Sequence, residues 1–225
     1  EMARFRFDSV MAANNIPGLS VAVSIEGQVV WSEGFGYANI ETGTPVTPVT
    51  KFRIGSVSKS LTSVAMGILI DEGRLELDVP VQRYAPSFPE KEQGAITSRL
   101  VGGHLAGIRH YRGMENFSSR KYLTVTDALG IFKDDALQTP PGEAYSYSSY
   151  GWNLLSAVVE GASGEEFLPY IYGNVFGPLD MRNTLAEHMD SIIVARGAYY
   201  VRSGRGMSAR IINAPYVDNS YKWAG

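Results

Sequence analysis

The spacing of apolar residues in this chain changes from the two-residue period of strands to the period of helices, and then back. Residues 19–25 alternate apolar with small or polar side chains, which is typical of a half-buried strand. Glu26-Gly27 predicts a tight turn, and residues 29–31 begin the return strand of a hairpin. A short helix that ends near Asn14 is predicted before the hairpin, because Ile16-Pro17-Gly18 would break it.

The middle of the chain, residues 76–190, carries little strand signal and several short helical patterns, such as 126–131 and 150–161. Because strands precede and follow these helices, we predict an α+β fold, an antiparallel sheet flanked by helices with an inserted helical lobe. The expected sheet lobe covers about 1–75 and 191–225, the inserted lobe about 76–190, and a second hairpin pairs 198–201 with 210–213 around Gly204 and Gly206.

Composition and charge exclude several classes of function. The 20 basic and 23 acidic side chains give a net charge of −3 without a basic stripe, so neither nucleic acid nor an anionic membrane is expected as the main partner. No apolar run approaches the roughly 20 residues that span a bilayer. Cysteine is absent, which rules out disulfides and a cysteine nucleophile. The chain begins at Glu1 without a basic-then-apolar leader, so we expect no targeting segment within it.

The three histidines, His104, His110 and His188, do not pair at the spacing of metal ligands on a helix. His104 and His110 are expected to satisfy local hydrogen bonds instead. We therefore predict that the chain binds neither a metal nor a cofactor.

The strongest candidate for chemistry is the segment around Ser56 and Lys59. A short apolar stretch, residues 52–54, leads into Gly55-Ser56, and an apolar stripe of helical period then runs from Leu61 until Gly73 caps the helix. Ser56 and Lys59 match the S-x-x-K pattern of acyl-transfer enzymes. At this spacing the lysine can reach the hydroxyl, while the helix N-terminus can stabilise an oxyanion.

A second match, Ser118 to Lys121, shows that the pattern alone is weak. That match lies in a polar stretch with no strand before it and no strong apolar helix directly behind it. For Ser56 the competing interpretation is a helix cap with a surface lysine. The setting of strand, glycine and apolar helix favours Ser56 over Ser118 as the nucleophile.

Tyr147 is the candidate for proton transfer. It stands in a loop that leads into the apolar helix at 150–161, where a phenol could relay a proton between serine, lysine and leaving group. Tyr145 and Tyr150 lie close by, and buried structural tyrosines are common, so the local pattern leaves the role of each tyrosine open.

Together these segments resemble the class C β-lactamase and penicillin-binding-protein-like serine hydrolases, a family with a β-lactamase/transpeptidase-like α/β sandwich. The resemblance implies catalytic roles for Ser56, Lys59 and Tyr147, and the register of the paired leucines selects Tyr147 among its neighbours. The matching segments are 16–23 (IPGLSVAV), 52–59 (FRIGSVSK), 104–108 (HLAGI) and 147–155 (YSSYGWNLL).

Other segments are similar to one branch of this family, the mitochondrial serine β-lactamase-like proteins and their bacterial relatives. This branch implies esterase or peptidase activity more than resistance to β-lactams, and it makes a homo-oligomer possible. It also implies a mitochondrial location in a eukaryote, and the bacterial envelope or cytoplasm otherwise. These segments are 44–48 (TPVTP), 89–92 (PEKE), 108–111 (IRHY) and 216–225 (YVDNSYKWAG).

The chain departs from the family pattern in two places. Ser149 stands where the family has the asparagine of Tyr-x-Asn, which helps to hold the acyl amide of penicillin-like substrates; Ser149 is thus the substrate-binding candidate. The family's third motif, a Lys- or His-Thr-Gly triplet whose strand supplies the second oxyanion donor, is not found. We expect that motif, the rest of the sheet and a C-terminal helix beyond Gly225.

The sequence thus predicts a serine hydrolase that acts through an acyl-enzyme on a small-molecule or peptide substrate with an ester or amide bond. The alternative is a β-lactamase-like module that binds or self-assembles and has weak or no catalytic activity. An unrelated fold in which S-x-x-K is coincidental is the third possibility.

Overall fold

The computed structural model describes residues 2–204 and 209–225, which form two compact units. The first, called the sheet unit, contains the chain up to Arg53 together with Ile192–Pro215. The second, called the helical unit, contains Ile54–Ser191 and Tyr216–Gly225. Residues 54–75 and 216–225, expected beside the sheet, pack with the helices. Their apolar side chains, such as Leu69, belong to the core of the helical unit.

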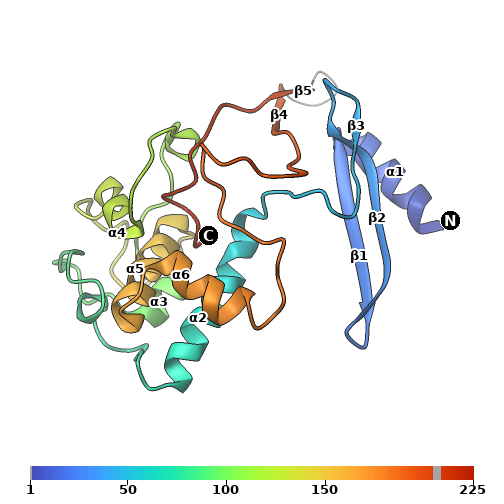
Figure 1. The fold of residues 1–225 in the computed structure, drawn as a ribbon. Helices are drawn as coiled ribbons and strands as arrows, with labels where there is room; N and C mark the ends of the chain where they lie inside the picture. Colours follow the sequence, from blue (N-terminus) through green and yellow to red (C-terminus); the bar gives the residue numbers. More distant parts are fainter. Residues whose placement is uncertain (1, 205–208) are drawn as a thin grey trace. The chain divides into compact units, whose positions relative to one another are not determined.

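The sheet unit opens with α1 (Met2–Asn14) and an antiparallel hairpin of β1 (Gly18–Ile25) and β2 (Gln28–Asn39), drawn in blue in Figure 1. The short strand β3 (Thr44–Pro45) pairs with the end of β2. Glu26 and Gly27 have φ of 51° and 79°, the conformation of a turn that matches the twist of a hairpin. The predicted helix, turn and strand pair are confirmed.

Aromatic rings hold α1 against the hairpin. The ring centroid of Phe7 lies 5.9 Å from that of Trp31 and 5.5 Å from that of Phe35, both in β2. The predicted half-burial of β1 is wrong near the turn, where Val23 and Ile25 are exposed. The turn end of the hairpin extends into solvent on both of its strands, so alternation of residue types there does not produce a buried face.

The second hairpin pairs β4 (Tyr200–Ser203) with β5 (Arg210–Asn213) in a sheet of their own. Its first strand begins two residues later than predicted, because the Ala198 N–H donates to the carbonyl of Ala38 instead. Gly204 has a φ of 89°, as a turn glycine can. Gly206, the other predicted turn glycine, lies outside the described residues.

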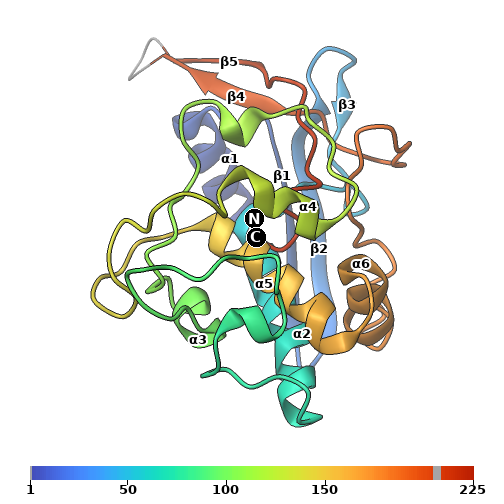
Figure 2. The same cartoon turned by 90° about the vertical axis from the view of Figure 1, so that its left-hand side faces the viewer.

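The helical unit is built around α5 (Ser149–Ser163), whose first eleven residues are all buried. A helix that is buried on every side must lie inside a core, and Figure 2 shows α5 among the other helices. The helices that contact it are α2 (Ser58–Asp71), α3 (Ser98–Gly102), α4 (Val125–Ala128) and α6 (Phe167–Ile171).

Helix ends in this unit follow local signals. Gly73 has a φ of 70° just after α2, as predicted, and Gly164 ends α5 in the same left-handed conformation. The predicted helix at 126–131 is divided into α4 and a 3₁₀ turn, because the Thr124 capping box starts the helix one residue earlier and the turn tightens after Ala128. The remaining turns are η2 (Val81–Arg83), η3 (Glu115–Phe117), η4 (Leu129–Ile131) and the π-helical η5 (Tyr172–Phe176).

Candidate active site

Ser56 lies in one 3₁₀ turn, η1 (Gly55–Val57), that continues directly into α2. Gly55 has a φ of 50°, a left-handed conformation that glycine adopts without strain, so the chain can turn sharply before the helix. The serine therefore stands at the N-terminal end of α2, as the sequence predicts, with its side chain exposed.

Four side chains from two distant segments form one cluster, those of Ser56, Lys59, Tyr147 and Ser149. Lys59 Nζ donates to Ser56 Oγ at 3.2 Å, the contact that the i, i+3 spacing predicts. The hydroxyl oxygens of Ser56 and Tyr147 are 2.6 Å apart and share a hydrogen bond. Lys59 Nζ also donates to Ser149 Oγ at 3.2 Å. The structure thus brings together all four predicted site residues, and their roles in catalysis stay predictions.

Lys59 is held by its surroundings, since its side chain is only 8% exposed. Its Nζ lies 5.0 Å from the ring centroid of Tyr147 and 6.0 Å from that of Trp152. Gly225 packs so closely that a Cβ there would lie 2.8 Å from Nζ. These contacts leave the Lys59 amine little freedom other than to face Ser56 and Ser149.

The electrostatics of Tyr147 suit proton transfer. Burial by itself would raise the pKa of the phenol, but hydrogen bonds from Lys59 and Ser56 and the charge of Lys59 bring the pKa below its usual value of 10.0. A phenol with a lowered pKa gives up its proton at a lower pH. Tyr147 therefore combines the shortest contact to Ser56 Oγ with a readily formed basic state.

His104 and His110 hold the loop that carries Tyr147. The backbone N–H of Ser148 donates to His104 Nδ1 at 3.1 Å, and that of Ser149 donates to His110 Nδ1 at 3.2 Å. Both histidines satisfy hydrogen bonds, as predicted, but their partners lie 44 and 39 residues away in the sequence and are not local. Across the ranges 2–204 and 209–225, no three side chains of the His, Cys, Asp or Glu type gather as metal ligands would.

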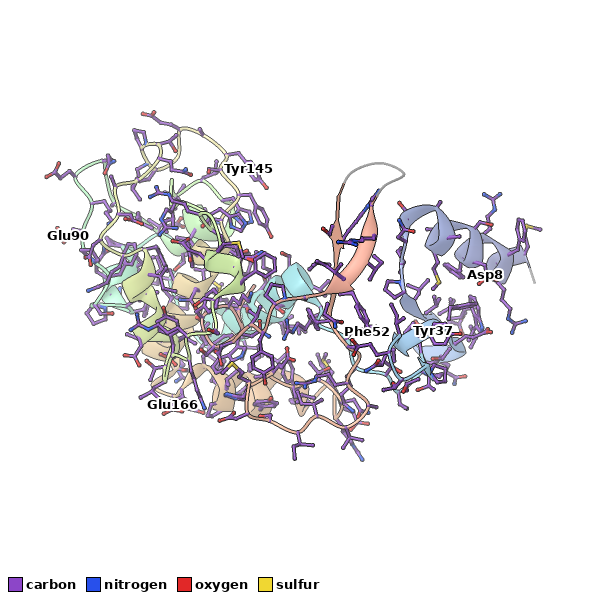
Figure 3. The ribbon with its side chains drawn as sticks, turned by 90° about the horizontal axis from the view of Figure 1, so that it is seen from above. Asp8, Tyr37, Phe52, Glu90, Tyr145 and Glu166 are labelled. Carbon is purple, nitrogen blue, oxygen red and sulfur yellow. The ribbon has the colours of Figure 1, made fainter. Side chains whose placement is uncertain are left out.

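The competing candidates lie apart from this cluster. Tyr145 is 68% exposed and lies on the outside of the helical unit, where Figure 3 labels it, whereas Tyr147 is 38% exposed. Tyr150 is buried and donates to Glu115 at 3.0 Å. In the second S-x-x-K match, Ser118 Oγ accepts from a backbone N–H and Lys121 pairs with Asp190 at 2.8 Å.

An ion-pair network around the buried Arg109, missed in the sequence, supports the loop. Arg109 is 4% exposed and donates to the carboxylates of Glu115, at 2.7 Å, and Asp135. Its carbonyl oxygen accepts from Ser148 Oγ at 2.7 Å, which ties the network to the residue after Tyr147. Local spacing could not reveal this network, because Asp135 lies 26 residues from Arg109.

An Arg109→Met variant is expected to lose about 2–4 kcal/mol of unfolding free energy, because it leaves two carboxylates without their cation. Both carboxylates keep some contact with water, so the loss of unfolding free energy should lie at the lower end of the range for broken buried ion pairs. Urea denaturation followed by tryptophan fluorescence measures it. In the matched control, Arg83→Met, the exposed pair with Glu76 should contribute under about 1 kcal/mol. Equal losses in the two variants would contradict a supporting role for Arg109.

Known proteins resemble this chain over most of its length. The family model described as Beta-lactamase matches residues 5–217 of this chain. The chain belongs to the β-lactamase family. Within it, the chain is 36% identical to the mitochondrial serine beta-lactamase-like protein LACTB of Homo sapiens, across 93% of this chain and 50% of that protein.

Solved structures share the fold of this chain. The octameric penicillin-binding protein homologue from Pyrococcus abyssi superposes with a TM-score of 0.77 and 26% identity over 96% of this chain and 50% of its own. EstCE1, described as a hydrolase with promiscuous acyltransferase activity, also superposes at 0.77 and 26%, over 92% of this chain and 57% of its own. The predicted fold class and family are confirmed, and the chain spans about half the length of the curated relatives it matches.

Among the helices that the structure describes, none is both long and apolar enough to cross a bilayer.

Proposed function

We propose that this β-lactamase-family chain carries the catalytic serine of a hydrolase that forms an acyl-enzyme with ester or amide substrates. The observation that carries the proposal is the hydrogen-bonded cluster of Ser56 with Tyr147, at 2.6 Å, and Lys59, at 3.2 Å. A serine hydroxyl is a weak nucleophile unless a neighbouring group removes its proton, and two such groups lie within reach.

In the first half of the proposed reaction, Ser56 Oγ attacks the substrate carbonyl carbon while its proton moves to the Tyr147 oxygen. Lys59 also hydrogen-bonds this phenol, so an uncharged Lys59 can take the phenol's own proton and serve as the final base with Tyr147 as relay. The pair then returns one proton, by the same route, to the leaving alcohol or amine as the carbonyl re-forms. In the second half, a water molecule loses a proton to the same pair and attacks the acyl carbon. The bond from that carbon to Ser56 Oγ then breaks, the pair returns the proton to Oγ, and the acid leaves.

Ser149 supports a preference for esters or peptides over β-lactams. It is buried and its hydroxyl is already engaged by Lys59, and it offers no amide to hold the acyl amide of a penicillin. The description of EstCE1 as a hydrolase with promiscuous acyltransferase activity agrees with a reaction that passes through an acyl-enzyme. Self-association also stays a prediction, supported by the octameric homologue from Pyrococcus abyssi.

The test is covalent labelling of the whole protein with a fluorophosphonate, followed by digestion and mass spectrometry. We expect the adduct on the peptide that contains Ser56, and slower labelling of the same peptide by a fluorescent penicillin. An adduct on Ser118 would show that the wrong S-x-x-K match carries the chemistry. A folded whole protein that forms no adduct would favour the alternative, an inactive binding or self-assembling module.

A further inference from the structure

We propose that His104 and His110 are positioning residues, which keep Tyr147 and Ser149 in their reactive places only while both Nδ1 atoms are unprotonated. This inference rests on the proposed function, because it concerns the reactivity of Ser56. It assigns a role to two side chains that the proposed proton transfer does not use.

The two histidines act on consecutive backbone groups of one short loop. His104 Nδ1 accepts from the N–H of Ser148 at 3.1 Å, and His110 Nδ1 accepts from the N–H of Ser149 at 3.2 Å. The side chains on either side of these bonds, Tyr147 and Ser149, are the ones that contact Ser56 and Lys59. A shift of this loop would therefore move both partners of the candidate nucleophile and its lysine.

Ring contacts add to these hydrogen bonds. The centroid of His104 lies 4.4 Å from that of Tyr147, in a tilted arrangement, and His110 meets the same ring edge-on at 5.5 Å. Tyr147 thus contacts two imidazoles that also hold the backbone after it. The phenol can swing away from Ser56 only by breaking these contacts.

Protonation would reverse the role of each imidazole. A neutral ring can accept at Nδ1, but an imidazolium has only donors, so it would face a backbone N–H with another N–H. Burial, together with the charge of Lys59, lowers the pKa of both rings below 6.5, and His110 also lowers that of His104. The other titratable groups in ring contact are Tyr145 and Tyr147 for His104, and Tyr111 and Tyr147 for His110.

Replacing these histidines with asparagine separates hydrogen bonding from protonation. The asparagine side-chain oxygen can accept a hydrogen bond from a backbone N–H, and the side chain does not titrate. His104 has a φ of 59°, in the left-handed region that asparagine tolerates better than most residues. At His110 the backbone does not impose this restriction, so His110→Phe keeps a ring beside Tyr147 and removes only the acceptor. His188→Asn is the matched control, because His188 packs on Trp223 away from the loop.

The experiment measures the rate of fluorophosphonate labelling of the whole protein at saturating probe, from about pH 8 to about pH 5. We take the ratio of the rate for the double variant His104→Asn/His110→Asn to the rate for the parent. Ser56, Lys59 and Tyr147 are present in both proteins, so the ratio isolates the contribution of the histidines. It should be constant above pH 6.5 and rise as the pH falls below it, while the ratio for His188→Asn stays flat. His110→Phe should label about tenfold more slowly at every pH, with unchanged saturation by the probe.

A second readout needs no variant. In the parent, the backbone amide resonances of Ser148 and Ser149 should move with pH in step with the imidazole resonances of His104 and His110. A flat ratio for the double variant, or amides that do not follow the imidazoles, would overturn the inference. A parent that never labels at any pH would instead overturn the proposed function, and the amide titration would still decide the positioning role.

Discussion

A Ser56→Ala variant of the whole protein is expected to lose covalent labelling by a fluorophosphonate completely, and to lose about 10³-fold or more of its rate on an activated ester. The substitution removes the oxygen of Ser56, which hydrogen-bonds to both Lys59 and Tyr147. Because Ser56 is exposed, its loss creates no cavity, so the fold should be retained and the melting temperature should change little.

Ser118→Ala is the matched control, since it removes a serine with the same motif spacing from the same unit. Its hydroxyl accepts a local backbone N–H and contacts neither Lys59 nor Tyr147 among the described hydrogen bonds, so labelling should proceed at the parental rate. Retained labelling in Ser56→Ala together with loss in Ser118→Ala would reverse our assignment of the nucleophile. Labelling kinetics and intact-protein mass spectrometry measure both variants.

The Tyr147→Phe variant should label about 10² to 10⁴ times more slowly than the parent, the range for loss of a positioned proton-transfer group. The ring keeps its contacts with His104 and His110, so only the hydroxyl that lies 2.6 Å from Ser56 Oγ is removed. The variant should also change the pH profile. The pKa of Tyr147 lies below its usual 10.0, so the parental rate should rise as the pH approaches that pKa, and this rise should disappear in the variant.

Tyr145→Phe provides the control for Tyr147→Phe, because it removes a phenol two residues away that is largely exposed. It should leave both the rate and the pH profile unchanged. If Tyr147→Phe reacts as fast as the parent, the proton would have to pass directly from Ser56 to Lys59, and the relay would be disproved.

The sequence was most informative where the decisive interactions are local. The contact of Ser56 with Lys59 follows from their i, i+3 spacing, and the turn at Glu26-Gly27 follows from residues that tolerate positive φ. The joining of Tyr147 to Ser56 is different, since the two lie 91 residues apart. It was predicted from a family resemblance and from the register of the leucines behind Tyr147, which periodicity alone could not have supplied.

Interactions that depend on distant packing escaped prediction. Arg109 is a charged residue in a polar-looking stretch, and only the folded chain shows that it is buried between Glu115 and Asp135. The same holds for His104 and His110, whose local bonding was expected but whose partners, the N–H groups of Ser148 and Ser149, could not be named. Apolar alternation predicted that Val23 and Ile25 are buried, but both are exposed, because burial also requires an element that covers them.

The placement of Ser149 at the first residue of α5 gives the two halves of the candidate site different local stabilities. The helix is buried through Val159, so Ser149 cannot be displaced without opening the centre of the helical unit, a cooperative event of low frequency. Ser56 instead sits in an exposed 3₁₀ turn after a glycine. Amide hydrogen exchange should therefore be slow in α5 and fast at Ser56. The candidate nucleophile can then adjust its position to a substrate while Ser149 and the rest of α5 stay fixed.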